Sequence, residues 1–116
     1  MNTETRLMHV LDLGCGSGRD LAAWNVAVLD EVTGLDIDGS RLAAAKAQFP
    51  QRAFVQAAGE RLPFADASFD RVISTLALPY MNIPKALGEI HRVLVSGGRL
   101  SLSLHLPRFT LHELLR

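Results

Sequence analysis

The stretch VLDLGCGSGRD, residues 10–20, places three glycines within five positions directly after an apolar run. The short apolar run 7–13 predicts a buried strand. Glycine adopts backbone conformations that other residues avoid, so the cluster predicts a sharp turn or a close approach to a ligand. Residues 19–28 behind it are compatible with a helix. Strand, glycine turn and helix together predict the first unit of a parallel α/β sheet.

The same alternation continues along the chain. Further strands are predicted at 31–37, at 52–57, within 69–78 and at 99–106. Helices are predicted at 38–49, with Asp38 or Ser40 as N-cap and Pro50 as the stop, and at 83–98, with Gly97-Gly98 at its end. We therefore predict one domain, residues 1–116, folded as a Rossmann-like three-layer αβα sandwich with a mainly parallel sheet of about five strands.

The composition narrows the class of protein. The 116 residues include 12 basic and 12 acidic side chains, so no charge excess favours nucleic acid or an anionic membrane surface. No apolar stretch is long enough to span a membrane, and the polar N-terminus does not resemble a signal peptide. The single cysteine, Cys15, fits a reducing compartment. The four histidines share no metal-ligand spacing. We expect a cytoplasmic protein with a small-molecule substrate and no metal.

Asp36 lies 20 residues beyond the middle glycine, at the predicted end of the second strand. A carboxylate there accepts hydrogen bonds from ribose hydroxyls in nucleotide-binding α/β folds. Free N–H groups of the glycine turn would favour an anionic ligand group. However, Gly14, Gly16 and Gly18 do not follow the G-x-G-x-x-G spacing of dinucleotide sites, and Asp12 precedes them. The pattern favours a cationic nucleoside that carries an amino acid over a nicotinamide dinucleotide.

The motifs VLDLGCGSGRD, VTGLDID, GERLPFADASFDRVIST and ALGEIHRVLVSGGRLSLS resemble, in this order, the class I S-adenosylmethionine-dependent methyltransferases. The resemblance extends from about residue 10 to 104 and is greatest to small-molecule enzymes of the ubiquinone and menaquinone biosynthesis type. It implies S-adenosyl-L-methionine as the cofactor. It leaves the methyl acceptor and any catalytic residue unspecified.

The resemblance also implies roles for individual residues. The methionine part of the cofactor would lie against the glycine turn, the ribose against Asp36 and the adenine against Ile37. The full set of implied cofactor-binding residues is Asp12, Gly14, Cys15, Gly16, Gly18, Asp36, Ile37, Gly59, Glu60, Ser74, Thr75 and Leu76.

Two positions depart from the family pattern. Ala58 stands where relatives often carry the acid that accepts the adenine amino group, which predicts weaker cofactor binding. Pro79 stands where relatives often carry a histidine, so a base at that position is not implied, although Tyr80 lies beside it.

Relative to the family pattern, the chain is expected to be truncated at both ends. Helices before the first strand and the last antiparallel hairpin would be absent, although Thr110 and Glu113 have the spacing of a new helix start. The fifth strand would then be an exposed edge, which predicts a homodimer. The alternative to an active enzyme is a cofactor-binding module without turnover.

Overall fold

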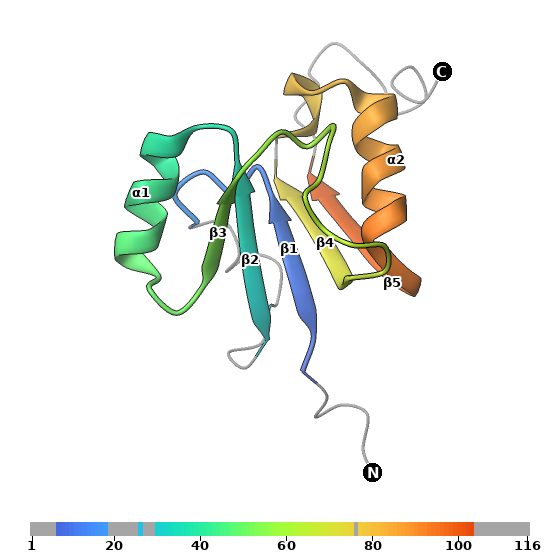
Figure 1. Ribbon diagram of the computed structural model, residues 1–116, viewed down its shortest axis with the longest axis horizontal. Helices are drawn as coiled ribbons and strands as arrows, with labels where there is room; N and C mark the ends of the chain where they lie inside the picture. Colours follow the sequence, from blue (N-terminus) through green and yellow to red (C-terminus); the bar gives the residue numbers. More distant parts are fainter. Residues whose placement is uncertain (1–6, 19–25, 27–29, 76, 104–116) are drawn as a thin grey trace.

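A five-stranded sheet with helices against it forms the centre of the molecule (Figure 1). The computed structural model describes residues 7–18, 26, 30–75 and 77–103. The strands are β1 (His9–Leu13), β2 (Glu31–Asp36), β3 (Ala53–Gln56), β4 (Phe69–Thr75) and β5 (Leu94–Ser103). The helical elements are α1 (Gly39–Gln48), the 3-10 turn η3 (Leu78–Tyr80) and α2 (Ile83–Val93).

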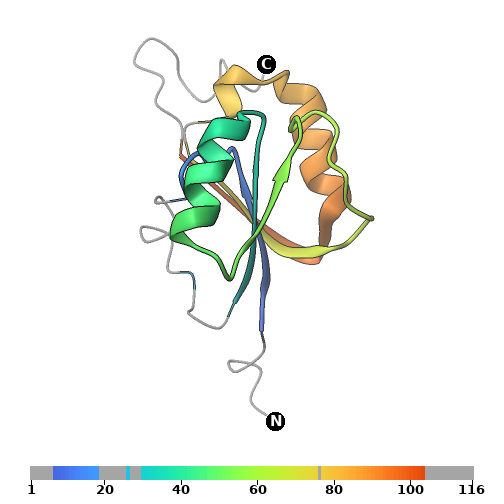
Figure 2. The same cartoon turned by 60° about the vertical axis from the view of Figure 1, so that its left-hand side comes forward.

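The strands lie in the order β3-β2-β1-β4-β5, and all neighbouring pairs are parallel. From β1 the chain moves outward to β2 and β3, and then crosses back to β4 on the other side of β1. Because right-handed crossovers in opposite directions lie on opposite faces of a sheet, α1 and α2 cover different faces. Figure 2 shows the sheet between these two helices. The predicted Rossmann-like fold is confirmed.

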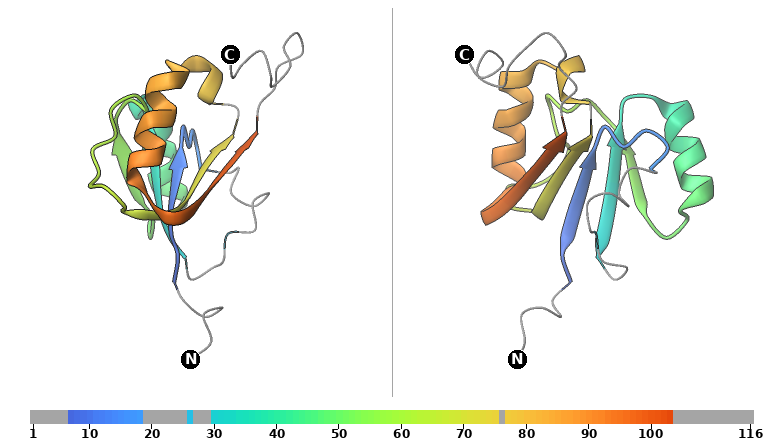
Figure 3. Two further views of the ribbon diagram at one scale, coloured as in Figure 1. Left: turned by 90° about the vertical axis from the view of Figure 1, so that its right-hand side faces the viewer. Right: turned by 180° about the vertical axis from the view of Figure 1, so that it is seen from behind.

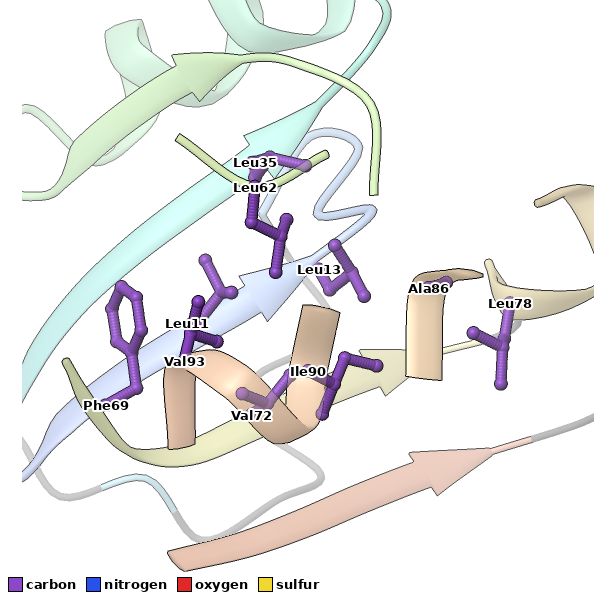
Figure 4. Close-up of a cluster of buried hydrophobic side chains, with 10 residues drawn as sticks. All are labelled: Leu11, Leu13, Leu35, Leu62, Phe69, Val72, Leu78, Ala86, Ile90 and Val93. Carbon is purple, nitrogen blue, oxygen red and sulfur yellow. The ribbon is translucent and has the colours of Figure 1, made fainter. Parts of the chain in front are cut away.

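Alternate residues of β1 enter two apolar layers, as the two-residue period of a strand requires. Leu11 and Leu13 belong to the larger cluster, which includes the buried residues of α2 and is drawn in Figure 4. Val10 faces the other way and packs with Val32 and Ile73. The central strands are therefore buried on both faces, which explains why β1 has apolar residues at Val10, Leu11 and Leu13 without an alternation of apolar and polar side chains.

Both helices begin at a side chain that caps their free N–H groups. The Asp38 carboxylate accepts hydrogen bonds from the N–H groups of Ser40 and Arg41, and the Asn82 side chain accepts one from Lys85. These bonds hold the pKa of the Asp38 carboxyl below its usual range, the Ser40 hydroxyl contributing most. The residues that the helices bury are Leu42 and Ala45 from α1, and Ala86, Ile90 and Val93 from α2.

The predicted end of the second helix is wrong. The helix ends at Val93 rather than at Gly97-Gly98, and Leu94 already pairs with Phe69 as the first residue of β5. The backbone N–H of Ser68 donates to the Val93 carbonyl, so sheet-like pairing replaces the next helical turn. Gly97, at φ +79°, lies where the β4–β5 register shifts, so the glycines bend a strand instead of ending a helix.

The loop between β3 and β4 is tied to α2 through Arg92. Its guanidinium donates to the carbonyl oxygens of Leu62 and Phe64 and to the Asp66 carboxylate, at 2.8–2.9 Å. Glu89 accepts from the Leu62 N–H at 2.8 Å and from Arg92, and these bonds hold the pKa of the Glu89 carboxyl below its usual value. The loop therefore has a defined course from the carboxyl end of β3 to the amino end of β4.

Two predicted helices, at 19–28 and from Thr110, fall wholly or almost wholly outside the described residues, as does the end of the predicted fifth strand after residue 103. Within the described part, no helix is long and apolar enough to cross a membrane.

Candidate functional site

The glycine turn after β1 is held by hydrogen bonds within the protein. Gly14, Gly16 and Gly18 all have positive φ angles, between 54° and 83°, which explains the residue type at each position. The N–H groups of Gly14 and Cys15 both donate to the Leu35 carbonyl, at 2.7 and 2.9 Å, and that of Gly18 donates to Cys15. The Gly16 N–H donates to the Asp36 carboxylate. The expectation that free N–H groups of this turn would hold an anion is therefore wrong for the three glycines and Cys15, because their N–H groups already donate hydrogen bonds to β2 or to the turn itself.

Asp36 connects the ends of β1 and β2. One carboxylate oxygen accepts from the Gly16 N–H at 2.8 Å, and the other accepts from the Asp38 N–H at 2.9 Å. The side chain is only 7% exposed, so these two bonds fix its direction. A carboxylate has about four acceptor positions, so the contacts of the described residues leave one on each oxygen. Asp36 is thus oriented in advance, with acceptor capacity suited to a pair of hydroxyl groups.

Three loops meet above the carboxyl ends of the strands. A Cβ on Gly14 would overlap that of Ala77, which follows β4, and a Cβ on Gly59 would lie 2.5 Å from the Met81 sulfur. Only glycine permits the approach of Ala77 to Gly14, and the Met81 side chain fills the space that Gly59 leaves, so the loops after β1, β3 and β4 pack into one another. By contrast, no atom of the other described residues lies within 4 Å of a Cβ placed on Gly16. The strands all point toward this end of the sheet, where η3 lies (Figure 3).

A cavity of about 410 Å³ opens at this junction. Seven of the predicted site residues line it: Gly14, Gly16, Asp36, Ile37, Gly59, Glu60 and Thr75. The remaining lining residues are Leu35, Arg41, Ala57, Ala58, Ala77, Tyr80 and Met81. The cavity therefore extends from the end of β2, across the glycine turn, to the segment after β4.

Four predicted residues lie beside the cavity without lining it. Asp12 and Ser74 are almost fully buried in their strands, and the Ser74 hydroxyl has no hydrogen-bond partner among the described residues. Cys15 is 2% exposed, with its sulfur against Gly34. Gly18 faces the ring of Phe49 at the end of α1. Leu76, the twelfth predicted residue, lies outside the described residues.

The Cys15 thiol has low nucleophilic reactivity in this environment. Burial raises the pKa of its thiol from 9.0 to about 12, and the charges of Asp12 and Asp36 add to the effect. The nucleophilic thiolate is therefore scarce at neutral pH. Cys15 fills space under the turn, against Gly34.

Two charged side chains on the cavity wall, Glu60 and Arg41, differ in how firmly they are held by other residues. Glu60 accepts a hydrogen bond from the Asn82 N–H at 2.9 Å, so it also holds the start of α2. Arg41 makes a looser ion pair with Asp38, at 3.6 Å, and is two-thirds exposed. The sequence analysis did not predict that Arg41 and Met81 line the cavity. The only signal in the sequence was that both residues follow, within a few positions, strands whose ends form the site.

Within the described residues, no group of three histidine, cysteine, aspartate or glutamate side chains could hold a metal ion. Organic cofactors that present hydroxyl groups and a flat apolar ring fit the wall better. Asp36 supplies oriented acceptors, and Ile37, which is 71% exposed, supplies an apolar surface next to it.

Comparison with known proteins gives the family. Residues 11–102 match a family model described as a methyltransferase domain. The chain is 40% identical to malonyl-[acyl-carrier protein] O-methyltransferase of Pseudescherichia vulneris over 101 residues, which are 86% of this chain and 40% of that protein. It is 39% identical over 113 residues to the enzyme of the same name from Erwinia billingiae, covering 97% of this chain and 44% of that one.

A solved structure supports the same assignment. The TehB-like S-adenosylmethionine-dependent methyltransferase of Corynebacterium glutamicum superposes with a TM-score of 0.80 at 26% identity, over 95% of this chain and 62% of that one. The chain belongs to the class I S-adenosylmethionine-dependent methyltransferases, whose cofactor is S-adenosylmethionine. It spans less than half the length of the two curated relatives. None of these findings specifies the ubiquinone and menaquinone group that the sequence resembles.

Proposed function

We propose that this chain is the cofactor-binding core of a methyltransferase, with Asp36 holding the ribose of S-adenosylmethionine. The observation that carries the proposal is the fixed Asp36 carboxylate, which is bonded to Gly16 and Asp38 and keeps an acceptor position on each oxygen. Ile37 offers its exposed side chain to the adenine ring. The open space at Gly16 admits the methionine part of the cofactor over the turn.

We further propose that the acceptor atom is a carboxylate oxygen. When bound, the cofactor supplies an electrophilic methyl group: the S–CH3 bond breaks as the O–CH3 bond forms, and S-adenosylhomocysteine leaves. A carboxylate is already ionised at neutral pH and needs no base. This agrees with a cavity that has no histidine among its described lining residues, and with Pro79 in place of the familial histidine. The curated relatives named above are O-methyltransferases that act on a malonyl-carrier substrate.

Protein groups would then act by position rather than by proton transfer. Asp36 orients the nucleoside, and the glycine turn fixes the height of the methionine part above β1. Met81 and Ala77 hold the segment after β4 against this turn.

Cofactor binding is tested by calorimetric titration with S-adenosylhomocysteine. Replacing Asp36 with Asn should weaken binding roughly 10- to 100-fold, because hydrogen bonds to a charged acceptor contribute about 1.5–3 kcal/mol. Asp38→Asn is the matched control: it makes the same chemical change two residues away, outside the cavity, and Asn still caps a helix. Equal binding by wild type and Asp36→Asn, with both proteins folded, would refute the proposal. NAD should not bind.

Turnover is a separate question, since the chain spans less than half of its curated relatives and a binding module without turnover remains the second candidate. Radiolabelled methyl transfer should be assayed with a malonyl thioester and with malonate. Label in a base-labile methyl ester supports the carboxylate acceptor. Cofactor binding without label on either compound supports the binding module.

Two further expectations, on location and on assembly, belong to this proposal. A cytoplasmic location is suggested by the single cysteine alone. A homodimer through β5 is suggested by its place at one end of the described sheet. Light scattering over a range of concentrations tests the dimer, and a monomeric mass at the highest concentration would exclude it.

A further inference from the structure

Two exposed apolar side chains share the cavity. Among the described residues, the large hydrophobic side chains left exposed are Leu7, Ile37 and Tyr80, at 46%, 71% and 91%. Ile37 and Tyr80 both line the cavity, whereas Leu7 does not. Single exposed apolar residues are common, but two of them on the wall of one cavity indicate surfaces that ligands cover.

The backbone that carries Tyr80 is firmly held. In η3, Leu78 is 2% exposed within the main core, and the N–H groups of Tyr80 and Met81 close the turn onto Ala77 and Leu78. On the other side of Tyr80, the Met81 side chain fits against Gly59. The ring of Tyr80 is therefore exposed on a hydrogen-bonded and partly buried turn, which lowers the entropic cost of ordering the backbone when a ligand binds there.

The order of the strands separates Ile37 from Tyr80. Ile37 follows β2 and Tyr80 follows β4, and β1 with its glycine turn lies between these two strands in the sheet. A nucleoside held by Asp36 occupies the β2 end. The methyl donor then extends over β1, so its partner in the reaction must approach from the β4 end, where Tyr80 lies.

We propose that Tyr80 is a specificity-determining residue that packs its ring against the hydrocarbon part of an acyl-chain acceptor. The inference rests on the proposed function above, since Asp36 defines which end of the cavity is left for the acceptor. The immediate surroundings favour an apolar contact: η3 itself carries no charge, and the neighbouring lining residues Ala77 and Met81 are apolar. An aromatic ring with few rotatable bonds binds such a surface at low entropic cost.

The test uses butanoate, hexanoate and octanoate as probes, with the full chain in the presence and absence of S-adenosylhomocysteine. Saturation-transfer NMR titration gives the dissociation constants. Affinity should rise with chain length, by up to roughly fourfold for each CH2 that is fully buried. In Tyr80→Ala the dependence on length should disappear, and octanoate should bind about tenfold more weakly. Tyr80→Phe should behave as wild type, and so should Leu7→Ala, which removes the exposed apolar side chain outside the cavity.

Several results would overturn the inference. Equal losses in Tyr80→Phe and Tyr80→Ala would assign the effect to the hydroxyl instead of the ring. A loss of S-adenosylhomocysteine affinity in Tyr80→Ala that matched the octanoate loss would make Tyr80 a cofactor contact. A lower melting temperature in Tyr80→Ala with unchanged octanoate binding would mean that the ring stabilises the fold and does not contact the acceptor. Equal affinities of the wild-type protein for butanoate, hexanoate and octanoate would also refute the contact.

The two proposals fail in different ways. If wild type does not bind S-adenosylhomocysteine but still prefers octanoate through Tyr80, the proposed function is wrong and the apolar contact is real. If S-adenosylhomocysteine binds through Asp36 but Tyr80→Ala leaves all probes unaffected, only the assignment of Tyr80 is wrong.

Discussion

Replacing Gly14 and Gly16 separately with alanine should rank the two variants in one order for stability and in the reverse order for ligand binding. Both residues have positive φ, at 72° and 54°, where an L-residue costs about 1–2 kcal/mol. At Gly16 we expect no further cost, because within the part of the chain that the structure describes no atom lies within 4 Å of the new methyl group. At Gly14 the methyl group would also lie closer to the Ala77 Cβ than real Cβ contacts allow, which adds about 1–3 kcal/mol for overpacking.

The two variants should therefore differ in stability by about 2 kcal/mol, with Gly14→Ala the less stable. At roughly 4 °C per kcal/mol for a chain of this size, their melting temperatures should differ by about 8 °C. Binding should follow the reverse order in folded protein: the methyl group of Gly16→Ala enters the open space over the turn and should weaken S-adenosylhomocysteine binding at least about tenfold, equivalent to about 1.4 kcal/mol.

Urea denaturation and calorimetric titration of both variants measure these two quantities. The reasoning is refuted if Gly16→Ala is as unstable as Gly14→Ala, because the open space at Gly16 would then be filled by the protein. It is also refuted if Gly16→Ala is folded and binds S-adenosylhomocysteine as wild type does, because the ligand would then avoid the turn.

Three further predictions concern other parts of the chain. Ala58→Asp should restore an acceptor at the adenine end and tighten S-adenosylhomocysteine binding about tenfold, by about 1–3 kcal/mol; calorimetry that shows no tightening would argue against a missing acceptor. Since the pKa of the Cys15 thiol is raised from 9.0 to about 12, the folded state binds more protons than the unfolded state between these values. The free energy of unfolding should therefore fall as the pH rises above 9, and iodoacetamide should label native protein far more slowly than urea-unfolded protein at pH 8; equal rates would contradict the burial argument. Gly88→Ala, in α2, should raise the free energy of unfolding by about 1 kcal/mol, whereas Gly97→Ala should lower it by about 1 kcal/mol because Gly97 has φ +79°. Neither new methyl group meets an atom of the described residues within 4 Å, so packing does not explain the difference. Thermal melts in which both variants shift in the same direction would refute the role of the positive φ at Gly97.

The carboxylate of Asp36 has two roles that are hard to separate. It satisfies two backbone N–H groups, which would otherwise lack acceptors at the ends of β1 and β2, and it keeps acceptor positions for a ligand. Part of any loss in Asp36→Asn will come from a disturbed glycine turn. Asp38→Asn does not share this effect, because among the described contacts the Asp38 side chain bonds only to Ser40 and Arg41 at the start of α1, and the backbone N–H that Asp38 donates to Asp36 is unchanged.

Local sequence signals predicted most of the strands, and the glycine turn with Asp36 predicted the pairing of β1 and β2 at the site. They did not predict where α2 ends. Leu94 continues the apolar stripe of the helix, so the local pattern favours a longer helix. The chain becomes a strand at Leu94 because Leu94 pairs with Phe69 and the Val93 carbonyl accepts from the Ser68 N–H, and both partners are distant in sequence. Tertiary pairing overrode the local pattern there.

What the sequence determined by itself is the order of elements and the chemistry at the strand ends, because the period of apolar residues and the conformational freedom of glycine act over a few residues only. Which groups share a cavity was decided by the tertiary structure. The approach of Ala77 to Gly14 and of Met81 to Gly59 brings η3 over the turn and leaves Tyr80 exposed beside it. Such contacts depend on the packing of three separate loops, and no spacing along the chain encodes their distances.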